Sequence, residues 1–233
     1  MNKILIQNAF SDLKKLSKDN TAQRKLSYKF DSKFLSYQPF LKDFSSQHYK
    51  IFNELASQLD LQGSLEELFK GGVVNKTENR PALHHQYRSN QKSIDFNYKK
   101  ITEPFIRRIK KEGFKNIVTF GIGGSYEGPK LLQEFTKNKS SKLNYFFISG
   151  PDKDEFNSIL SPLSGQKNFY IFSSKSLSTD ETLICLRWLG RERNPMNSLV
   201  ITSNSKKAVS MGFHENCIVP FPESVGGRYS IWS

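Results

Sequence analysis

The sequence predicts an α/β protein in which a mainly helical N-terminal region precedes a buried parallel sheet. Three observations support this prediction. Short apolar runs recur after residue 116, helix-like segments separate most of them, and no convincing strand pattern precedes residue 108. Apolar strands that alternate with helices are typical of βαβ units with a buried parallel sheet. We therefore expect an N-terminal helical extension, residues 1–108, and an α/β domain, residues 109–233.

The N-terminal region combines helical patterns with a polar connection. Ser64 and Glu67 have the spacing of a capping box, and Gly113 is the residue type that commonly ends a helix. The segment 71–88 is polar and rich in turn residues. The expected helices are residues 49–61, 64–70 and 101–112.

The C-terminal region alternates between two kinds of segment. Its apolar runs predict strands at residues 117–120, 145–148, 169–172, 199–201 and 217–219. Its helix-like segments are residues 129–136, 155–160, 180–189 and 205–211. Ligands of such sheets bind at the carboxyl ends of the strands, so the loops that follow the strands are the candidate functional segments.

Composition narrows the function classes. The formal net charge is +13, which attracts nucleic acid, anionic membrane or anionic metabolites. The basic residues are dispersed, and no basic block is interleaved with aromatic residues, so a nucleic-acid-binding function would rest on charge alone. No apolar run approaches the ~20 residues of a membrane span, so we expect no membrane insertion. A small phosphorylated substrate fits the same charge.

Cysteine usage and the N-terminus indicate a compartment. Cys185 and Cys217 stand alone, without CxxC spacing or a histidine cluster, so neither a disulfide framework nor a metal site is expected. The first eight residues lack the long apolar stretch and cleavage site of a secretory signal. These features predict a cytoplasmic protein.

The first candidate loop, residues 121–129, is rich in glycine and lies between a predicted strand and a predicted helix. Such a turn can present backbone N–H groups to an anion, or can serve only as a tight turn. A dinucleotide fingerprint would need glycine at Tyr126, and a P-loop would need Gly-Lys-Ser/Thr where Gly128 is followed by Pro129. Neither NAD nor ATP is favoured.

The second loop, residues 173–182, carries several hydroxyls and Lys175 before a predicted helix. Ser178 and Glu181 have capping-box spacing, which places a helix N-terminus here. Hydroxyls, loop N–H groups and a helix dipole together suit a phosphate monoester. An ordinary helix cap rich in serine and threonine explains the same residues equally well.

The third loop places Arg228 behind Gly226 and Gly227. A guanidinium at the carboxyl end of a strand can stabilise a negative oxygen that develops during a reaction. The alternative is a structural salt bridge. Because all three loops follow parallel strands, they should converge on one sheet edge and form a pocket for a small anionic substrate.

Four motifs, in order, resemble the glucose-6-phosphate isomerase family. The segment 121–125 resembles its glycine-rich turn, and 174–182 resembles its Ser-Lys-Thr-Phe-Thr-Thr-x-Glu-Thr phosphate loop. The segment 225–230 matches its Gly-Gly-Arg-Tyr-Ser motif. Upstream, 75–88 is similar to a segment of its N-terminal helical region.

This resemblance implies an aldose–ketose isomerase that interconverts glucose 6-phosphate and fructose 6-phosphate through an enediol, without a metal or organic cofactor. The family is built from a pair of three-layer α/β/α sugar-isomerase domains. Its active site lies at a dimer interface, so a homodimer is expected for the full-length protein. The partner implied is a small sugar phosphate.

The resemblance also assigns roles by position. Gly124 and Ser125 would contact the sugar, and Arg228 would stabilise the enediolate. The phosphate would be bound by Ser174, Ser176 and Thr179, with the backbone around Lys175.

This sequence departs from the family at several positions, among them Ser176, Ser178, Leu177 and Pro81, and two further departures bear most on the site. Glu127 stands where the family more often has leucine, which adds a negative charge near the expected anion site. The family's general-base glutamate, ring-opening histidine and late lysine all follow the Gly-Gly-Arg-Tyr-Ser motif, which ends here at Ser230. His84 and His85 are interpreted as structural or surface residues. A fragment without its base is therefore expected; the alternative is a non-catalytic sugar-phosphate-binding module or an inactive remnant.

Overall fold

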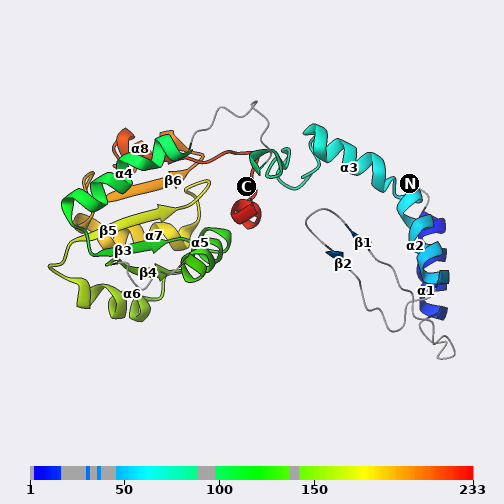
Figure 1. The fold of residues 1–233 in the computed structure, drawn as a ribbon, viewed down its shortest axis with the longest axis horizontal. Coiled ribbons are helices and arrows are strands. Elements are labelled where there is room, and N and C mark those ends of the chain that lie inside the picture. The colour runs from blue at the N-terminus through cyan, green and yellow to red at the C-terminus, as the bar shows by residue number, and fades with distance from the viewer. Residues whose placement is uncertain are drawn as a thin grey trace. The chain divides into compact units, whose positions relative to one another are not determined.

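The computed structural model describes residues 3–16, 30–31, 36–37, 46–88, 98–136 and 142–232 (Figure 1). The chain divides into two compact units, Met1–Val74 and Asn75–Ser233. The change in sequence pattern predicts a boundary near residue 108, which stays a prediction because it rests on pattern rather than on contacts.

The N-terminal unit is mainly helical. Its helices are α1 (Lys3–Leu16), α2 (Ser46–Gln58) and α3 (Leu61–Lys70). A pair of two-residue antiparallel strands, β1 (Phe30–Asp31) and β2 (Ser36–Tyr37), was not expected from the sequence. Strands of two residues are too short to leave a periodic pattern.

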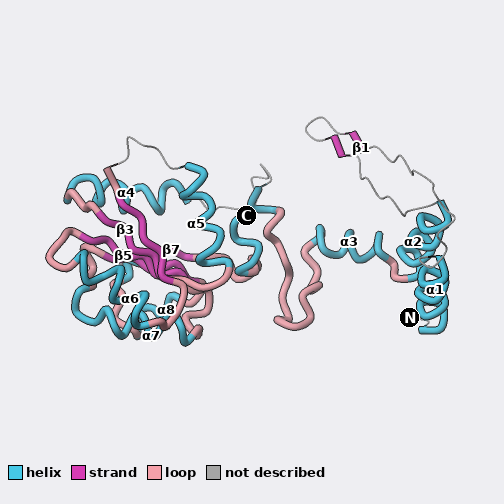
Figure 2. Tube along the Cα trace, turned by 90° about the horizontal axis from the view of Figure 1, so that it is seen from below, coloured by secondary structure: helices cyan, strands magenta, loops and turns pink. Residues whose placement is uncertain are grey.

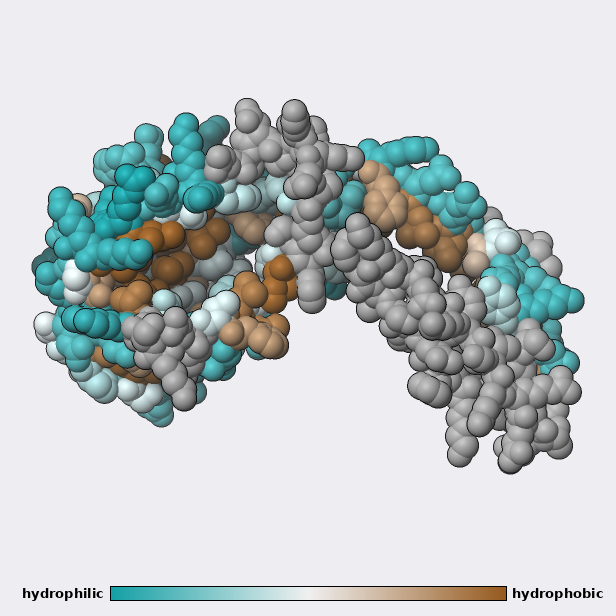
Figure 3. Space-filling view, in the orientation of Figure 1, coloured by the Kyte–Doolittle hydropathy of each residue, from teal (hydrophilic) through white to brown (hydrophobic). Residues whose placement is uncertain are grey.

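The predicted capping box of α3 is wrong. The helix begins at Leu61, and its N-cap is Asp60, whose carboxylate accepts a hydrogen bond from the Gly63 N–H at 3.1 Å. Ser64 already lies inside the helix, because aspartate caps as well as serine does and stands one turn earlier. Figure 3 shows hydrophobic side chains gathered over α3, where the exposed apolar residues are Leu61, Leu65 and Phe69.

The second unit contains the predicted parallel sheet, with strand order β4-β3-β5-β6-β7. Every strand end lies within one residue of its predicted position. The strands are β3 (Asn116–Phe120), β4 (Asn144–Ile148), β5 (Asn168–Ser173), β6 (Ser198–Thr202) and β7 (Ile218–Pro220).

Helices cover both faces of this sheet, so the unit has three layers (Figure 2). One face carries α4 (Tyr98–Glu112) and α5 (Gly124–Thr136). The other carries α6 (Lys153–Leu160), α7 (Asp180–Leu189) and α8 (Ser205–Ser210). The α4 helix ends before Gly113, which has a φ of +70°, as the sequence predicts.

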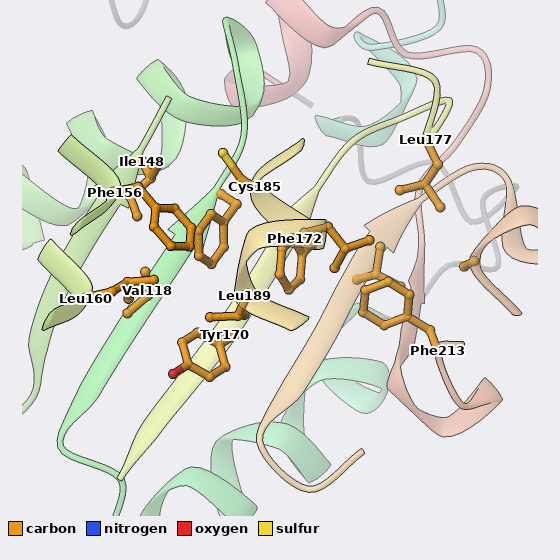
Figure 4. Packing of buried hydrophobic residues seen from close by; sticks show 14 of the residues in the cluster. Val118, Ile148, Phe156, Leu160, Tyr170, Phe172, Leu177, Cys185, Leu189 and Phe213 are labelled. Atoms are coloured by element: carbon orange, nitrogen blue, oxygen red, sulfur yellow. The ribbon is translucent and has the colours of Figure 1, made fainter. Parts of the chain in front are cut away.

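Side chains of the strands point alternately to the two faces of the sheet and contribute to an apolar cluster on each face. Phe105 of α4 packs against Ile117, Phe169 and Leu199 on the first face. The second face holds the larger cluster, which joins the sheet to α6, α7 and α8 (Figure 4). Its fully buried strand residues include Val118, Phe120, Tyr170, Phe172 and Val200. This two-sided burial explains why the strands appear in the sequence as continuous apolar runs.

Three asparagines lock the register of the central strands at their amino ends. Asn116 pairs with Asn144 on one side and Asn168 on the other. Its Nδ2 donates to Asn168 Oδ1 at 2.8 Å, and Asn144 Nδ2 donates to its Oδ1 at 2.9 Å. A shift of either strand by one residue breaks this ladder and turns the apolar residues to the wrong face.

Replacing Asn116 with leucine should therefore destabilise the sheet unit. The substitution removes the hydrogen bond that Asn116 Nδ2 donates to the buried Asn168 Oδ1, and an acceptor left unpaired in this way costs about 2 to 3 kcal/mol of the free energy of unfolding. Urea unfolding measures the change, and Asn157→Leu on the exposed side of α6 is the matched control. Equal stability of the two variants would show that the asparagine ladder contributes nothing.

Candidate functional site

The glycine turn after β3 brings α5 against the C-terminal loop. Gly123 has a φ of +56°, and α5 begins directly after it at Gly124. A Cβ added to Gly124 would lie 1.9 Å from the carbonyl oxygen of Gly227. The Ser230 hydroxyl also donates to the Gly124 carbonyl at 3.3 Å. Only glycine at position 124 allows this close approach between two of the three predicted loops.

The start of α5 differs from the prediction, which placed it at Pro129. Proline is common at the first helical position, but here Gly123 and Gly124 make the turn and Pro129 lies inside the helix. The Ser125 N–H donates to the Ile122 carbonyl at 3.1 Å, and the next two amides donate to Gly123. These three amides are therefore already bonded, and from Ser125 the turn can offer a ligand the side-chain hydroxyl.

The serine-rich loop after β5 is folded around a buried leucine. Leu177 has a φ of +50° and is 1% exposed, so its side chain anchors the loop in the core (Figure 4). The Ser176 and Ser178 hydroxyls lie 2.5 Å apart at the exposed tip. Ser174 is buried, and its hydroxyl donates to Thr179 Oγ1 at 3.5 Å. Four of the loop's hydroxyls thus form two pairs.

The predicted capping box of α7 does not form. Thr179, not Ser178, is the N-cap residue, and its side chain makes no capping hydrogen bond. Ser178 instead pairs with Ser176. The helix itself begins and ends where the sequence predicts, at Asp180 and Leu189.

Two residues that the sequence reasoning missed support the serine loop. The Lys175 carbonyl accepts hydrogen bonds from Thr202 Oγ1, Ser203 Oγ and the Ser203 N–H, at 2.8, 2.8 and 2.9 Å. Both residues follow the apolar run 199–201 directly. The rule that ligands bind at the carboxyl ends of parallel strands, applied to this strand as well, could have identified both residues.

The Lys175 ammonium links the serine loop to the C-terminal loop. Its Nζ donates to the carbonyl oxygens of Glu223 and Val225. The pKa of Lys175 is lowered to about 8: burial is the main cause, the positive charge of Arg80 adds to it, and the negative charge of Glu223 opposes the shift. A lysine that loses its proton near physiological pH makes the charge of this site depend on pH.

Arg228 lies on the short helix η5 (Gly227–Trp232), behind the fully buried Val225. Its side chain is exposed, and in the described part of the chain no carboxylate pairs with it. The structural salt bridge considered from the sequence therefore does not form among those residues. The guanidinium fork stays available for a ligand.

Two cavities meet at this edge, and Lys175 and Gly227 line both. A narrow one of about 190 Å³ is lined by Gly124 and Ser125 together with apolar residues of α5 and η5. A wider polar one of about 870 Å³ includes Ser176 and the basic residues Arg80 and Lys206. Three predicted site residues line neither cavity: Ser174, Thr179 and Arg228.

The described ranges contain no group of three or more histidine, cysteine, aspartate or glutamate side chains placed to hold a metal ion. None of their helices combines the length and the apolar character that crossing a membrane requires.

A sheet covered on both faces, with glycine- and hydroxyl-rich loops at one edge, defines the class of α/β proteins that bind small ligands at the carboxyl ends of their strands. The family model of phosphoglucose isomerase matches residues 41–233. The chain belongs to this family, and the resemblance drawn from its motifs is confirmed.

Individual relatives agree with this assignment. Glucose-6-phosphate isomerase of Buchnera aphidicola subsp. Cinara cedri is 31% identical, with 98% of this chain and 48% of that protein covered. The Pseudomonas fluorescens protein of the same name is 30% identical, with 86% of this chain and 41% of that protein covered. The chain spans about half the length of the curated relatives it matches.

The solved structures support the fold. A glucose-6-phosphate isomerase from Chlamydia trachomatis superposes with a TM-score of 0.67 at 19% identity, covering 95% of this chain and 49% of that one. The predicted three-layer α/β/α sugar-isomerase fold is thus confirmed.

Proposed function

We propose that this chain forms the phosphate-binding half of an aldose–ketose isomerase that interconverts glucose 6-phosphate and fructose 6-phosphate. The convergence of the three loops carries the proposal. Gly124 packs on Gly227, and the Lys175 ammonium bonds the carbonyls of Glu223 and Val225. The loop that carries the hydroxyls and Lys175 and the loop that carries Arg228 therefore meet at one sheet edge, a combination that suits a sugar phosphate.

Each loop has its own role in this proposal. The hydroxyls of Ser176 and of the buried Ser174–Thr179 pair bind the phosphate, after their present hydrogen bonds rearrange. Ser125 and the Gly124 backbone contact the sugar. Arg228 stabilises the negative oxygen of the enediolate when a proton moves between adjacent carbons.

The proton transfer itself needs a positioned base, which often contributes 10²–10⁴-fold to the rate. In the family, this base follows the Gly-Gly-Arg-Tyr-Ser motif. We therefore propose that residues 1–233 bind the substrate without turning it over, and that the complete isomerase is a cytoplasmic homodimer.

Calorimetric titration of residues 1–233 tests the binding part. Fructose 6-phosphate should bind, and Ser176→Ala should weaken binding about fivefold, the value of one hydrogen bond. Ser210→Ala on the exposed side of α8 is the control. No binding by the unmodified chain would sink the proposal. Robust isomerase turnover by these residues alone would show that no missing base is needed.

Because of Lys175, the affinity for fructose 6-phosphate should fall at alkaline pH. Its pKa is lowered to about 8, so it loses its charge at a pH where an ordinary lysine keeps it. A phosphate monoester gains its second charge near pH 6, so affinity should peak between about pH 6 and 8 and fall above that range. Titrations from pH 6 to 10 measure this profile. Lys175→Met should bind more weakly and lose the alkaline fall; an unchanged fall would assign it to another group.

A further inference from the structure

The motif at residues 75–88 has no role in the proposed function, yet it lies against the loop that carries Arg228. The Leu83 N–H donates to the Ser224 carbonyl at 2.8 Å. The His84 ring stacks on Tyr229, with ring centroids 4.7 Å apart and planes 12° from parallel. These contacts lie on both sides of the turn that precedes Arg228.

Arg80 makes the contact that joins this motif to the phosphate-binding loop. Its Nη1 donates to the Glu223 carbonyl at 3.1 Å, and Lys175 Nζ donates to the same oxygen. One carbonyl thus accepts from two cations that are far apart in the sequence. Because Lys175 also holds the Val225 carbonyl, the chain is fixed immediately before Gly226.

The Arg80 side chain is itself held in place. It is 29% exposed, and its Nη2 forms an ion pair with Glu78. The turn that precedes it is closed by Asn75, whose Oδ1 accepts from Thr77 Oγ1 at 2.8 Å and from the Glu78 N–H at 3.3 Å. A guanidinium anchored in this way gives its hydrogen bond with little loss of conformational freedom.

Arg80 lines the polar cavity, but both of its terminal nitrogens already have protein partners. We propose that Arg80 is a positioning residue, which holds the Glu223 carbonyl so that the turn before Arg228 keeps its place. This inference rests on the proposed function for its binding consequences. Its structural consequence, a fixed loop, does not depend on which ligand binds.

Arg80 also sets part of the electrostatic environment of Lys175. The charged groups that face the Lys175 ammonium are Arg80 and Glu223, and Glu78 and Lys206 line the same cavity. Removing the Arg80 charge should raise the pKa of Lys175 toward its ordinary value. The alkaline limit of anion binding should then move to higher pH, an effect that a purely structural contact would not produce.

Arg80→Met tests the proposal in the 233-residue chain, and Arg107→Met is the matched control. Arg107 also forms one ion pair, with Glu103 on α4, and its side chain is 76% exposed. Hydrogen exchange is measured at two backbone amides of the loop. The Val225 N–H donates to the Pro222 carbonyl, and the Tyr229 N–H donates to the Gly226 carbonyl. Arg80→Met should speed exchange at both by about tenfold, and Arg107→Met should leave it unchanged.

Ligand titrations separate positioning from direct binding. Arg80→Met should weaken the binding of fructose 6-phosphate about tenfold and the binding of inorganic phosphate less than about twofold. The reason is that only the sugar part of the ligand depends on the position of Arg228. Arg80→Lys, which keeps the charge, should recover part of the loss and provides a test if Arg80→Met does not fold. The proposal would be overturned if both ligands lost affinity by the same factor, or if hydrogen exchange at Val225 and Tyr229 stayed unchanged. If the unmodified chain binds no sugar phosphate, the proposed function fails and the exchange result alone decides the role of Arg80.

Discussion

Gly124→Ala is expected to weaken fructose 6-phosphate binding severely, although it adds a single methyl group. The new Cβ would lie 1.9 Å from the Gly227 oxygen, 2.4 Å from its carbonyl carbon and 3.0 Å from the Arg228 nitrogen. All three are backbone atoms, so no side-chain rotation relieves the clash. The C-terminal loop must move away from α5, and Arg228 moves with it.

Helix propensity works against this effect and is too small to cancel it. Alanine is more favourable than glycine within a helix by about 1 kcal/mol, so α5 itself should tolerate the change. We therefore expect the variant to fold, with binding weakened by more than about 30-fold, roughly 2 kcal/mol. Calorimetry measures the affinity, and circular dichroism checks the helical content.

Gly150→Ala is the matched control. Gly150 has no positive φ, and a Cβ there would meet no atom within 4 Å, so binding should stay as in the unmodified chain. If Gly124→Ala binds as well as Gly150→Ala does, the close approach of the two loops is not needed for the site.

The five strands of the parallel sheet could be predicted from the sequence because each is a short apolar run, and in most of them burial on both faces requires it. Residues 116–120 are all buried, and each predicted strand is found within one residue. Helix starts were less predictable. Asp60 rather than Ser64 caps α3, and α5 begins before Pro129. Aspartate, serine and threonine cap equally well locally, so tertiary contacts decide among them.

The location of the candidate site followed from topology, but its internal contacts did not. Parallel strands bring the Gly124, Lys175 and Arg228 loops to one edge, whatever their side chains do. The hydrogen bond from Arg80 to Glu223 spans 143 residues, and no local pattern encodes it. Nor does the sequence show that Lys175 points its ammonium at backbone carbonyls.

Arg228→Ala should reduce isomerase turnover far more than substrate binding. Fructose 6-phosphate carries no negative charge at the reacting carbons, whereas the enediolate does, so the guanidinium acts mainly in the transition state. One such donor contributes roughly 3 kcal/mol, and kcat/KM of the proposed complete isomerase should fall about 10²-fold. The affinity of residues 1–233 for fructose 6-phosphate should fall less than about tenfold, the value of one or two hydrogen bonds.

Two further variants make this comparison specific. Arg228→Lys keeps the positive charge but loses the planar fork, so its turnover should lie between those of the unmodified protein and Arg228→Ala. Arg187→Ala removes another exposed arginine, near the end of α7, and should change neither quantity. If Arg228→Ala lowers turnover and affinity by the same factor, Arg228 binds the ground state and the transition state equally. Arg228 would then have a binding role only, because uniform binding does not accelerate a chemical step.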